Sequence, residues 1–471
     1  MYNQRVETGV THLDQALQGG LPLGSLTLVA GNPGTGKTIL CGEFLYRGAA
    51  DGENCLYVSL AEGREGFLEY MRRLGRDFDE PDTRGHLDIM DLVSVKEEGL
   101  DVLIEMITAR IDAQSISRLV IDSFTALTNA FTVTIDARVT LHILSKILAQ
   151  TGCTTLLVTE VPTGTARMGL GVEEFVADGV LHLRRGVAGG CTVRTLEVTK
   201  MRGTLIDRPL HLVSIHEGFK VIPLFQQTEI RKPEPYTPIP DMGESYSTGN
   251  RQLDSLTGGL RRGDTVYVEL GDDISPVVPA LLVGPLRASF LSQGRGVMFM
   301  PPGGESLERI HRFDQQFGLK PETRRNLRVA TTATNRVDDP SALTLDPDSL
   351  EASQRTWAQA EARLTEETGA PALKIIYVDT IQNSWRQGNH KRFLDAESTA
   401  TRSTGGLMIL LSRPGGEALG QHASNLAHTH IKASNHEGVI LLQGVKPRTP
   451  LYAAAQDDAM GYPSLSLTPI R

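Results

Sequence analysis

The sequence has few cysteines, few aromatic side chains and no long hydrophobic run. Its four cysteines are far apart and form no C-x-x-C pair; they are Cys41, Cys55, Cys153 and Cys191. This spacing predicts neither a zinc site nor a disulfide, and for most of them we expect the role of a small buried apolar residue. No run of about eighteen apolar residues occurs. Because the N-terminus also lacks a signal-peptide segment, we expect a cytoplasmic protein without a membrane partner.

An excess of basic residues is also missing. Lysine and arginine total 47 against 56 aspartates and glutamates, which gives a formal net charge of −9. Nucleic-acid binding through the whole surface requires a basic footprint. The composition therefore disfavours a nucleic-acid partner and leaves a local basic groove as the alternative. With 40% hydrophobic and 22% charged residues the chain is typical of a globular protein, and its length predicts two or three domains.

The most informative stretch that is present is a phosphate-binding loop. Eight consecutive residues fit the pattern G-x-x-x-x-G-K-[ST] at every fixed position: Gly31, Asn32, Pro33, Gly34, Thr35, Gly36, Lys37 and Thr38. An apolar run precedes the loop and a helical apolar pattern follows it, so a bare glycine-rich turn with a surface lysine is disfavoured. We expect the loop to bind the phosphates of ATP, with Lys37 reaching the β- and γ-phosphates and Thr38 binding Mg²⁺.

A second candidate metal ligand follows another apolar run. Leu119-Val120-Ile121 leads directly into Asp122. An acid at the end of a strand near the phosphate loop organises Mg²⁺ and water in such sites, and we assign that role to Asp122. The alternative is that Asp122 caps the N-terminus of a helix after a buried strand.

Strand-like and helical patterns alternate through the first half of the chain. Expected strands lie at 55–60, 119–122, 155–159, 179–183 and 194–198, with amphipathic helices at 100–113 and 135–149. This alternation is typical of an α/β fold in which a mostly parallel twisted sheet is flanked by helices.

The sequence repeats itself after a proline-rich stretch. Thr8-Gly9-Val10-Thr11-His12-Leu13-Asp14 corresponds to Thr248-Gly249-Asn250-Arg251-Gln252-Leu253-Asp254, a spacing of 240 residues. We therefore predict two copies of one domain. The first occupies residues 1–225 and carries the phosphate loop, an extended linker occupies 226–245, and the second copy occupies 246–471.

The first half resembles a KaiC-type domain of the RecA superfamily of ATPases, from residue 6 to about 223. The matching segments, in family order, are 8–14, 19–22, the phosphate loop, Val120-Ile121-Asp122-Ser123, Gly171-Val172-Glu173-Glu174-Phe175-Val176-Ala177-Asp178 and Lys200-Met201-Arg202-Gly203-Thr204. The resemblance implies a RecA-like fold for both domains. It also implies ATP and Mg²⁺ as ligands and a homo-oligomeric ring, usually a hexamer, with nucleotide held between subunits.

The same resemblance assigns roles to Lys200 and Arg202. In that family a K-x-R pair reaches the γ-phosphate bound by the neighbouring subunit. A cation supplied in this way stabilises the charge that develops on the transferred phosphoryl group, and it couples hydrolysis to assembly. The alternative is a solvated basic turn after a strand. Thr159-Glu160 stands where the superfamily places a polar sensor of the γ-phosphate.

One departure from the family concerns the catalytic base. Family members place two glutamates after the second strand, the first of which is taken to polarise the attacking water, but this chain has Ala61 there, followed by Glu62. A methyl group cannot accept a proton, and general acid–base help is worth about 10²- to 10⁴-fold. Glu62 is the candidate substitute, and the alternative is an exposed acid at a strand end. We expect ATP binding with slow hydrolysis.

The second half resembles a KaiC-type domain without an active site. Its counterpart of the phosphate loop reads Gly271-Asp272-Asp273-Ile274-Ser275-Pro276-Val277-Val278, without lysine or a metal-binding hydroxyl. Two aspartates would repel phosphate. Asp379 keeps the outline of the acid-bearing strand but has no metal to serve. We expect no ATP in this domain.

These observations predict a regulatory or assembly ATPase of KaiC-like type. Nucleotide at the subunit interfaces of the first domain would switch assembly or the binding of a protein partner in regulation or signalling. The alternative is an accessory ATPase of DNA recombination or a helicase, which the acidic composition disfavours.

Overall fold

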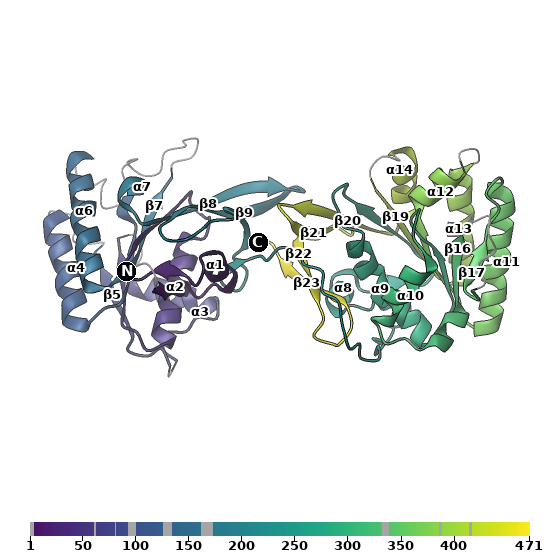
Figure 1. Ribbon diagram of the computed structural model, residues 1–471, viewed down its shortest axis with the longest axis horizontal. Helices are drawn as coiled ribbons and strands as arrows, with labels where there is room; N and C mark the ends of the chain where they lie inside the picture. The colour runs from purple at the N-terminus through teal and green to yellow at the C-terminus, as the bar shows by residue number, and fades with distance from the viewer. Residues whose placement is uncertain are drawn as a thin grey trace. The chain divides into compact units, whose positions relative to one another are not determined.

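A computed structural model covers the chain and describes residues 4–60, 63–80, 82–92, 100–125, 134–161, 173–331, 339–385, 389–413 and 417–471. The chain divides into two compact units. Residues Met1–Pro223 and Pro469–Arg471 form the first, and Leu224–Thr468 form the second. In each unit helices cover both faces of one large sheet (Figure 1).

The sheet of the first unit has nine strands in the order β11-β10-β9-β8-β3-β7-β6-β4-β5. The strands are β3 (Leu26–Gly31), β4 (Cys55–Ser59), β5 (Leu87–Asp91), β6 (Arg118–Asp122), β7 (Thr154–Glu160), β8 (Gly179–Ala188), β9 (Cys191–Met201), β10 (Leu210–Ser214) and β11 (Lys220–Val221). Pairing is parallel from β8 to β5, and antiparallel from β8 outward to β11. A separate ribbon pairs β1 (Arg5–Val6) with β2 (Leu21–Pro22).

The helices of the first unit form two layers. They are α1 (Thr11–Ala16), α2 (Lys37–Ala50), α3 (Arg64–Arg73), α4 (Leu100–Gln114), α6 (Thr134–Thr151) and α7 (Glu173–Val176). One core contains Phe44 of α2 and Phe67 of α3, and the other contains Ile111 of α4 and Leu148 of α6. Strand β3 is buried along its whole length, and its sequence is accordingly a nearly continuous apolar run, as is typical of a strand covered on both faces.

The sheet of the second unit has ten strands in the order β17-β16-β15-β18-β19-β14-β20-β21-β22-β23. They are β14 (Thr265–Leu270), β15 (Val297–Met300), β16 (Leu327–Thr331), β17 (Ala342–Thr344), β18 (Leu373–Tyr377), β19 (Leu407–Ser412), β20 (Thr429–His436), β21 (Val439–Lys446), β22 (Leu451–Asp457) and β23 (Ser464–Pro469). A ribbon of β12 (Ser245–Tyr246) and β13 (Leu260–Arg261) accompanies it.

The helices of the second unit again lie on both faces of the sheet (Figure 1). They are α8 (Arg251–Thr257), α9 (Val277–Ser292), α10 (Leu307–Gln315), the 3-10 helix Pro321–Asn326, α11 (Leu350–Thr368), α12 (Val378–Ser384), α13 (His390–Thr404) and α14 (Glu417–Leu426). None of the helices in the described ranges is long and apolar enough to cross a bilayer.

The two sheets share one central topology. The order β8-β3-β7-β6-β4-β5 in the first unit corresponds to β20-β14-β19-β18-β15-β16 in the second. The chain is therefore an α/β protein with two RecA-like domains, which confirms the predicted fold class.

The repeated segments also make the same local contact. The backbone N–H of Thr8 donates to Asp14 Oδ1 over 2.7 Å, and its hydroxyl donates to the same atom over 2.8 Å. In the second unit Thr248 donates both bonds to Asp254 Oδ1 over 2.7 Å. The threonine and aspartate of the repeat thus fix the entry of the chain into each domain.

The proline-rich segment has no helix or strand between residues 226 and 241. It contributes to the packing of the second unit, because Tyr236 is buried against Phe317 and Tyr462. Asp241 forms an ion pair with Arg295 over 2.7 Å.

Candidate nucleotide-binding site

The phosphate loop joins the carboxyl end of β3 to the first residue of α2. Gly34 and Gly36 have φ angles of +74° and +102°, a region that favours glycine. A Cβ on Gly36 would lie 2.9 Å from Ile215 Cγ2. The glycines therefore permit a tight loop that leaves backbone N–H groups and the start of a 14-residue helix at one place.

Hydrogen bonds hold the loop and its lysine in position. Lys37 Nζ donates to the carbonyl oxygens of Gly31 over 2.8 Å and Asn32 over 3.1 Å. The Thr35 hydroxyl donates to Asn32 O, and Asn32 Nδ2 donates to Val161 O over 2.7 Å. Burial lowers the pKa of Lys37, and the charges of nearby Glu160 and Asp122 oppose that shift.

The predicted metal ligands Thr38 and Asp122 lie together. Thr38 Oγ1 donates to Asp122 Oδ2 over 2.8 Å, although the two residues are 84 positions apart. Burial raises the pKa of Asp122, while its contacts with Thr38, Lys37 and Tyr57 act in the opposite direction.

A hydroxyl and a carboxylate are oxygen ligands of the kind that Mg²⁺ prefers. Within the described residues no group of three or more His, Cys, Asp or Glu side chains could hold a metal. Mg²⁺ usually takes one or two protein ligands and completes its octahedron with phosphate oxygens and water. Thr38 and Asp122 thus fit a metal that arrives with a nucleotide better than a resident ion.

Two residues of the site were missed by sequence reasoning. The Tyr57 hydroxyl donates to Asp122 Oδ2 over 3.3 Å, and Arg194 Nε donates to the Gly34 carbonyl over 3.1 Å. The adjacent, register-matched strands β4 and β6 could have indicated Tyr57. No sequence signal points to Arg194, because it comes from β9, which is not adjacent to β3.

Lys200 and Arg202 lie away from the phosphate loop of their own chain. Met201 pairs with Gly179, which pairs with Thr27, four residues before Gly31. At about 3.3 Å per residue this places Lys200 and Arg202 roughly 13 Å along the sheet from the loop, towards the amino end of β3.

Contacts within the chain hold both cations. Lys200 Nζ donates to the carbonyl oxygens of Ala177 over 2.6 Å and Glu174 over 3.1 Å. Arg202 forms an ion pair with Asp178 over 2.8 Å, and its side chain is 48% exposed. The second Asp178 oxygen accepts a bond from the Leu26 N–H over 3.1 Å.

Glu160 ends β7 beside Gly31, with which it is in register. Its backbone N–H donates to Thr125 Oγ1 over 2.8 Å. Ala61 and the predicted base Glu62 lie outside the described residues, as do Gly171 and Val172 of the family segment.

The second unit builds the same corner with different residues. Helix α9 begins at Val277, as α2 begins at Lys37, so Val277 and Val278 occupy the places of Lys37 and Thr38. Asp272 and Asp273 are exposed. Asp379 lies in the first turn of α12 rather than at the end of β18, and its Oδ2 accepts a bond from the Arg413 N–H over 3.0 Å.

Known proteins are similar to this chain, some over its first half and one over nearly its whole length. A family model described as "ATPase: KaiC" matches residues 6–229. The UPF0273 protein MJ1359 of Methanocaldococcus jannaschii is 32% identical over 236 residues, which are 47% of this chain and 97% of that protein. Protein GvpD2 of Halobacterium salinarum is 26% identical over 495 residues, covering 94% of this chain and 93% of GvpD2.

A solved structure is similar to part of the chain. It is the KaiC-like protein PH0186 from Pyrococcus horikoshii OT3, which is 32% identical in sequence. The match covers 47% of this chain and 99% of PH0186, and the TM-score is 0.42.

Proposed function

This chain belongs to the KaiC-like family of RecA-superfamily P-loop ATPases, and we propose that its first domain binds Mg·ATP at residues 31–38. The observation that carries this proposal is the 2.8 Å contact between the Thr38 hydroxyl and the Asp122 carboxylate at the foot of the phosphate loop. In P-loop sites that hydroxyl and that acid hold the Mg²⁺ of the nucleotide.

Each group of the site has a defined task in this proposal. The N–H groups of 31–38 and the start of α2 bind the phosphates, and Lys37 neutralises the charge of the terminal ones. Thr38 and Asp122 would hold the Mg²⁺ of the nucleotide, which would supply Lewis-acid polarisation of the phosphoryl group. Tyr57 fixes one oxygen of Asp122 through its 3.3 Å hydrogen bond.

We propose that hydrolysis is slow. Ala61 replaces the residue that the family uses to polarise water, so proton removal depends on Glu62. A missing general base costs about 10²- to 10⁴-fold in rate. The bound nucleotide then lasts long enough to act as a switch of assembly or of partner binding rather than as a steady source of work.

We further propose that Lys200 and Arg202 act on the nucleotide of a neighbouring subunit in a homo-oligomeric ring. Their position roughly 13 Å along the sheet from the loop supports action between chains rather than within one. A ligand held at an interface stabilises the assembled state by its differential affinity for that state. We propose a cytoplasmic, nucleotide-switched assembly that binds a regulatory protein partner.

The test combines light scattering with ATPase measurement on the intact chain. We expect Mg·ATP to shift the protein to a ring and Lys37→Ala to abolish that shift together with hydrolysis. An unchanged monomer with and without Mg·ATP contradicts the assembly proposal.

A matched pair of variants separates the action of Arg202 from its ion pair. Arg202→Ala removes the cation, whereas Asp178→Asn weakens the same ion pair and keeps the cation. If Arg202 acts on a neighbour, only Arg202→Ala lowers the hydrolysis rate of the assembled form, by about 10³-fold or more. Equal effects of the two variants would assign Arg202 a structural role.

A further inference from the structure

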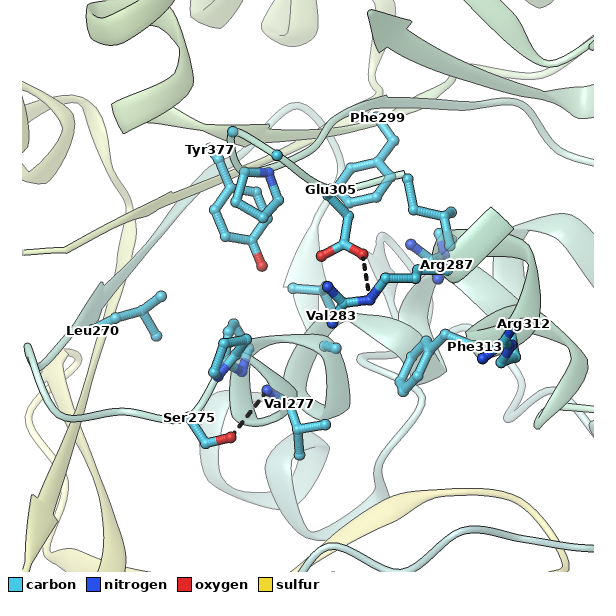
Figure 2. A pocket seen from close by; sticks show the side chains of 18 of the residues that line it. Leu270, Ser275, Val277, Val283, Arg287, Phe299, Glu305, Arg312, Phe313 and Tyr377 are labelled. Carbon is cyan, nitrogen blue, oxygen red and sulfur yellow. Dashed lines mark hydrogen bonds and ion pairs between the residues drawn. The ribbon is translucent and has the colours of Figure 1, made fainter. Parts of the chain in front are cut away.

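The second unit contains a cavity of about 620 Å³ at the corner of the sheet where the first unit has its phosphate loop. It lies between α9, α10 and the carboxyl ends of β15 and β18 (Figure 2). Apolar walls come from Leu270, Val283, Phe299, Ile310 and Phe313. Cavities of about 300–1,000 Å³ with apolar walls and a few convergent polar groups are typical of small-molecule sites.

Four arginines and two carboxylates line this cavity. Three of the arginines are paired with carboxylates: Arg287 with Asp314, Arg309 with Glu305 and Arg312 with Glu308. The arginines are Arg287, Arg309, Arg312 and Arg413, and the carboxylates belong to Glu305 and Asp379. Glu305 is already paired with Arg309 over 3.2 Å (Figure 2). Asp379 accepts the backbone N–H of Arg413 over 3.0 Å.

The guanidinium of Arg413 has no carboxylate partner among the described side chains. Its Nη2 donates to the carbonyl oxygen of Ile274 over 3.1 Å. Deeper in the wall, Arg287 is 4% exposed and is paired with Asp314. Its Nε is buried without a hydrogen-bond partner in the described part of the chain. Both arginines thus keep donors that neighbouring carboxylates do not occupy.

Tyr377 brings a hydroxyl to the same place. Figure 2 shows this hydroxyl pointing into the cavity from the end of β18. Burial raises the pKa of Tyr377; the charges of Glu305 and Asp379 add to that rise, and the charges of Arg287 and Arg413 oppose it. Tyr377 therefore stays protonated and is a hydrogen-bond donor directed at the same space as the arginines.

The residues of this corner lack the groups that bind Mg·nucleoside triphosphate in a phosphate loop. Val277 and Val278 supply neither the lysine nor the hydroxyl of the first unit, and Asp272 and Asp273 would repel a phosphate chain. The apolar walls and the Arg413 guanidinium, which has no carboxylate partner among the described side chains, instead suit an anionic group attached to an apolar body.

We propose that this cavity binds a small organic anion, with its charged group against Arg413 and the Tyr377 hydroxyl and its apolar body against Val283 and Phe299. The corner of the second domain that corresponds to the phosphate loop is then a separate ligand site. A metabolite of this class binds there without competing with ATP.

Two fluorescent probes that share one apolar body test the proposal by calorimetric titration of the intact chain. They are 8-anilinonaphthalene-1-sulfonate and uncharged N-phenyl-1-naphthylamine. We expect the sulfonate to bind roughly tenfold or more tightly than the neutral probe, because charge-assisted hydrogen bonds favour the anion. Arg413→Gln is expected to remove most of that preference. Equal affinity of the two probes for the unmodified chain would overturn the anion site.

A cavity-filling variant shows where the probe binds. Ala280 lines the cavity on α9, and Ala280→Trp is expected to abolish sulfonate binding. Ala358→Trp, on the exposed face of α11, adds the same side chain elsewhere and should leave binding unchanged. Retained binding in a folded Ala280→Trp variant contradicts the site, and Arg413→Gln decides the question if that variant does not fold. Lys37→Ala should leave sulfonate affinity unchanged, which separates this test from that of ATP binding.

Discussion

Asp122 is a half-buried carboxyl whose charge depends on pH. Burial raises its pKa, and hydrogen bonds from Thr38 and Tyr57 counteract part of the shift. Since Mg²⁺ binds the carboxylate and not the acid, a metal held by Thr38 and Asp122 would lose a ligand when the pH falls through this raised pKa. This occurs at a higher pH than for an ordinary aspartate of pKa about 3.9.

We therefore expect the affinity for Mg·ATP to decrease on acidification, beginning at a higher pH than an ordinary aspartate would give. Titration with a fluorescent ATP analogue over a pH series measures the effect. Asp122→Asn is the control, because ATP itself titrates identically in both experiments. The variant should bind more weakly, with a shallower pH dependence than the unmodified chain. Identical pH profiles for the two proteins would show that Asp122 does not control the metal.

Gly36 is a second residue with a measurable role. Its φ is +102°, and a Cβ at this position would lie 2.9 Å from Ile215, so the loop leaves no room for a side chain. A strained backbone of this kind costs about 1–3 kcal/mol. We expect Gly36→Ala to lower ATP affinity by roughly tenfold or more through distortion of the loop. Gly52→Ala, at a positive φ but in open space away from the loop, is the control. Equal ATP affinity of both variants would contradict the loop argument.

At this scale the sequence predicted the residues of local motifs and missed those that tertiary structure brings in. Thr38 and Asp122 were predicted as a pair, and the structure places them in contact; their role as metal ligands stays a prediction. Arg194 reaches Gly34 from β9, and a contact between distant strands leaves no periodic or spacing signal in the chain.

Among the elements of the second unit, the neighbouring strands β14 and β20 share an ion-pair cluster. Glu269 pairs with Lys432 over 2.7 Å, and its other oxygen lies 3.2 Å from His430 Nε2. The hydrogen bond with His430, aided by Lys432, lowers the pKa of Glu269 to about 2. Because the folded value is lower than the unfolded one, the cluster stabilises the fold above the unfolded pKa, and that contribution is lost as pH falls from about 4.5 to about 2.

We expect Glu269→Gln to lower the melting temperature by a few degrees at neutral pH. The melting temperature of the variant should also fall less steeply on acidification than that of the unmodified protein. Circular dichroism at a series of pH values measures both effects. Glu308→Gln removes one member of an exposed pair on α10, with a side chain 80% exposed, and should change little. A melting profile of Glu269→Gln that parallels the unmodified protein throughout would contradict the contribution of this cluster.

At the level of elements, apolar alternation predicted the fold class and most strands of the first sheet. The expected strand at 119–122 is observed as Arg118–Asp122. The strand that was expected to carry Asp379 ends before this residue, because the chain enters α12 at Val378. A short helix after an apolar run has no distinct period, so only the packing of the folded chain decides between strand and helix.

In the whole molecule, two domains of one topology have different chemistry. The first keeps lysine, threonine and aspartate around its loop, whereas the second has valines at the helix start and a cavity rich in arginine. The repeat at a spacing of 240 residues predicted the duplication. It could not predict the cavity, whose walls come from strands and helices far apart in the chain.

Assembly belongs to this scale as well, since Lys200 and Arg202 lie along the sheet from the phosphate loop of their own chain. If nucleotide binding and assembly are linked, ring formation depends on nucleotide concentration and on protein concentration together. Light scattering at a series of protein concentrations, in Mg·ATP and in Mg·ADP, should show different midpoints of assembly. Coincident midpoints would show that the nucleotide does not act as the switch.

Equilibrium titration of the intact chain with a fluorescent ATP analogue in Mg²⁺ decides whether nucleotide binds only at residues 31–38. The expected result is one nucleotide per chain, with binding abolished by Lys37→Ala and unchanged by Asp379→Asn. Two nucleotides per chain, or binding that survives Lys37→Ala, would contradict a single ATP site in the first domain.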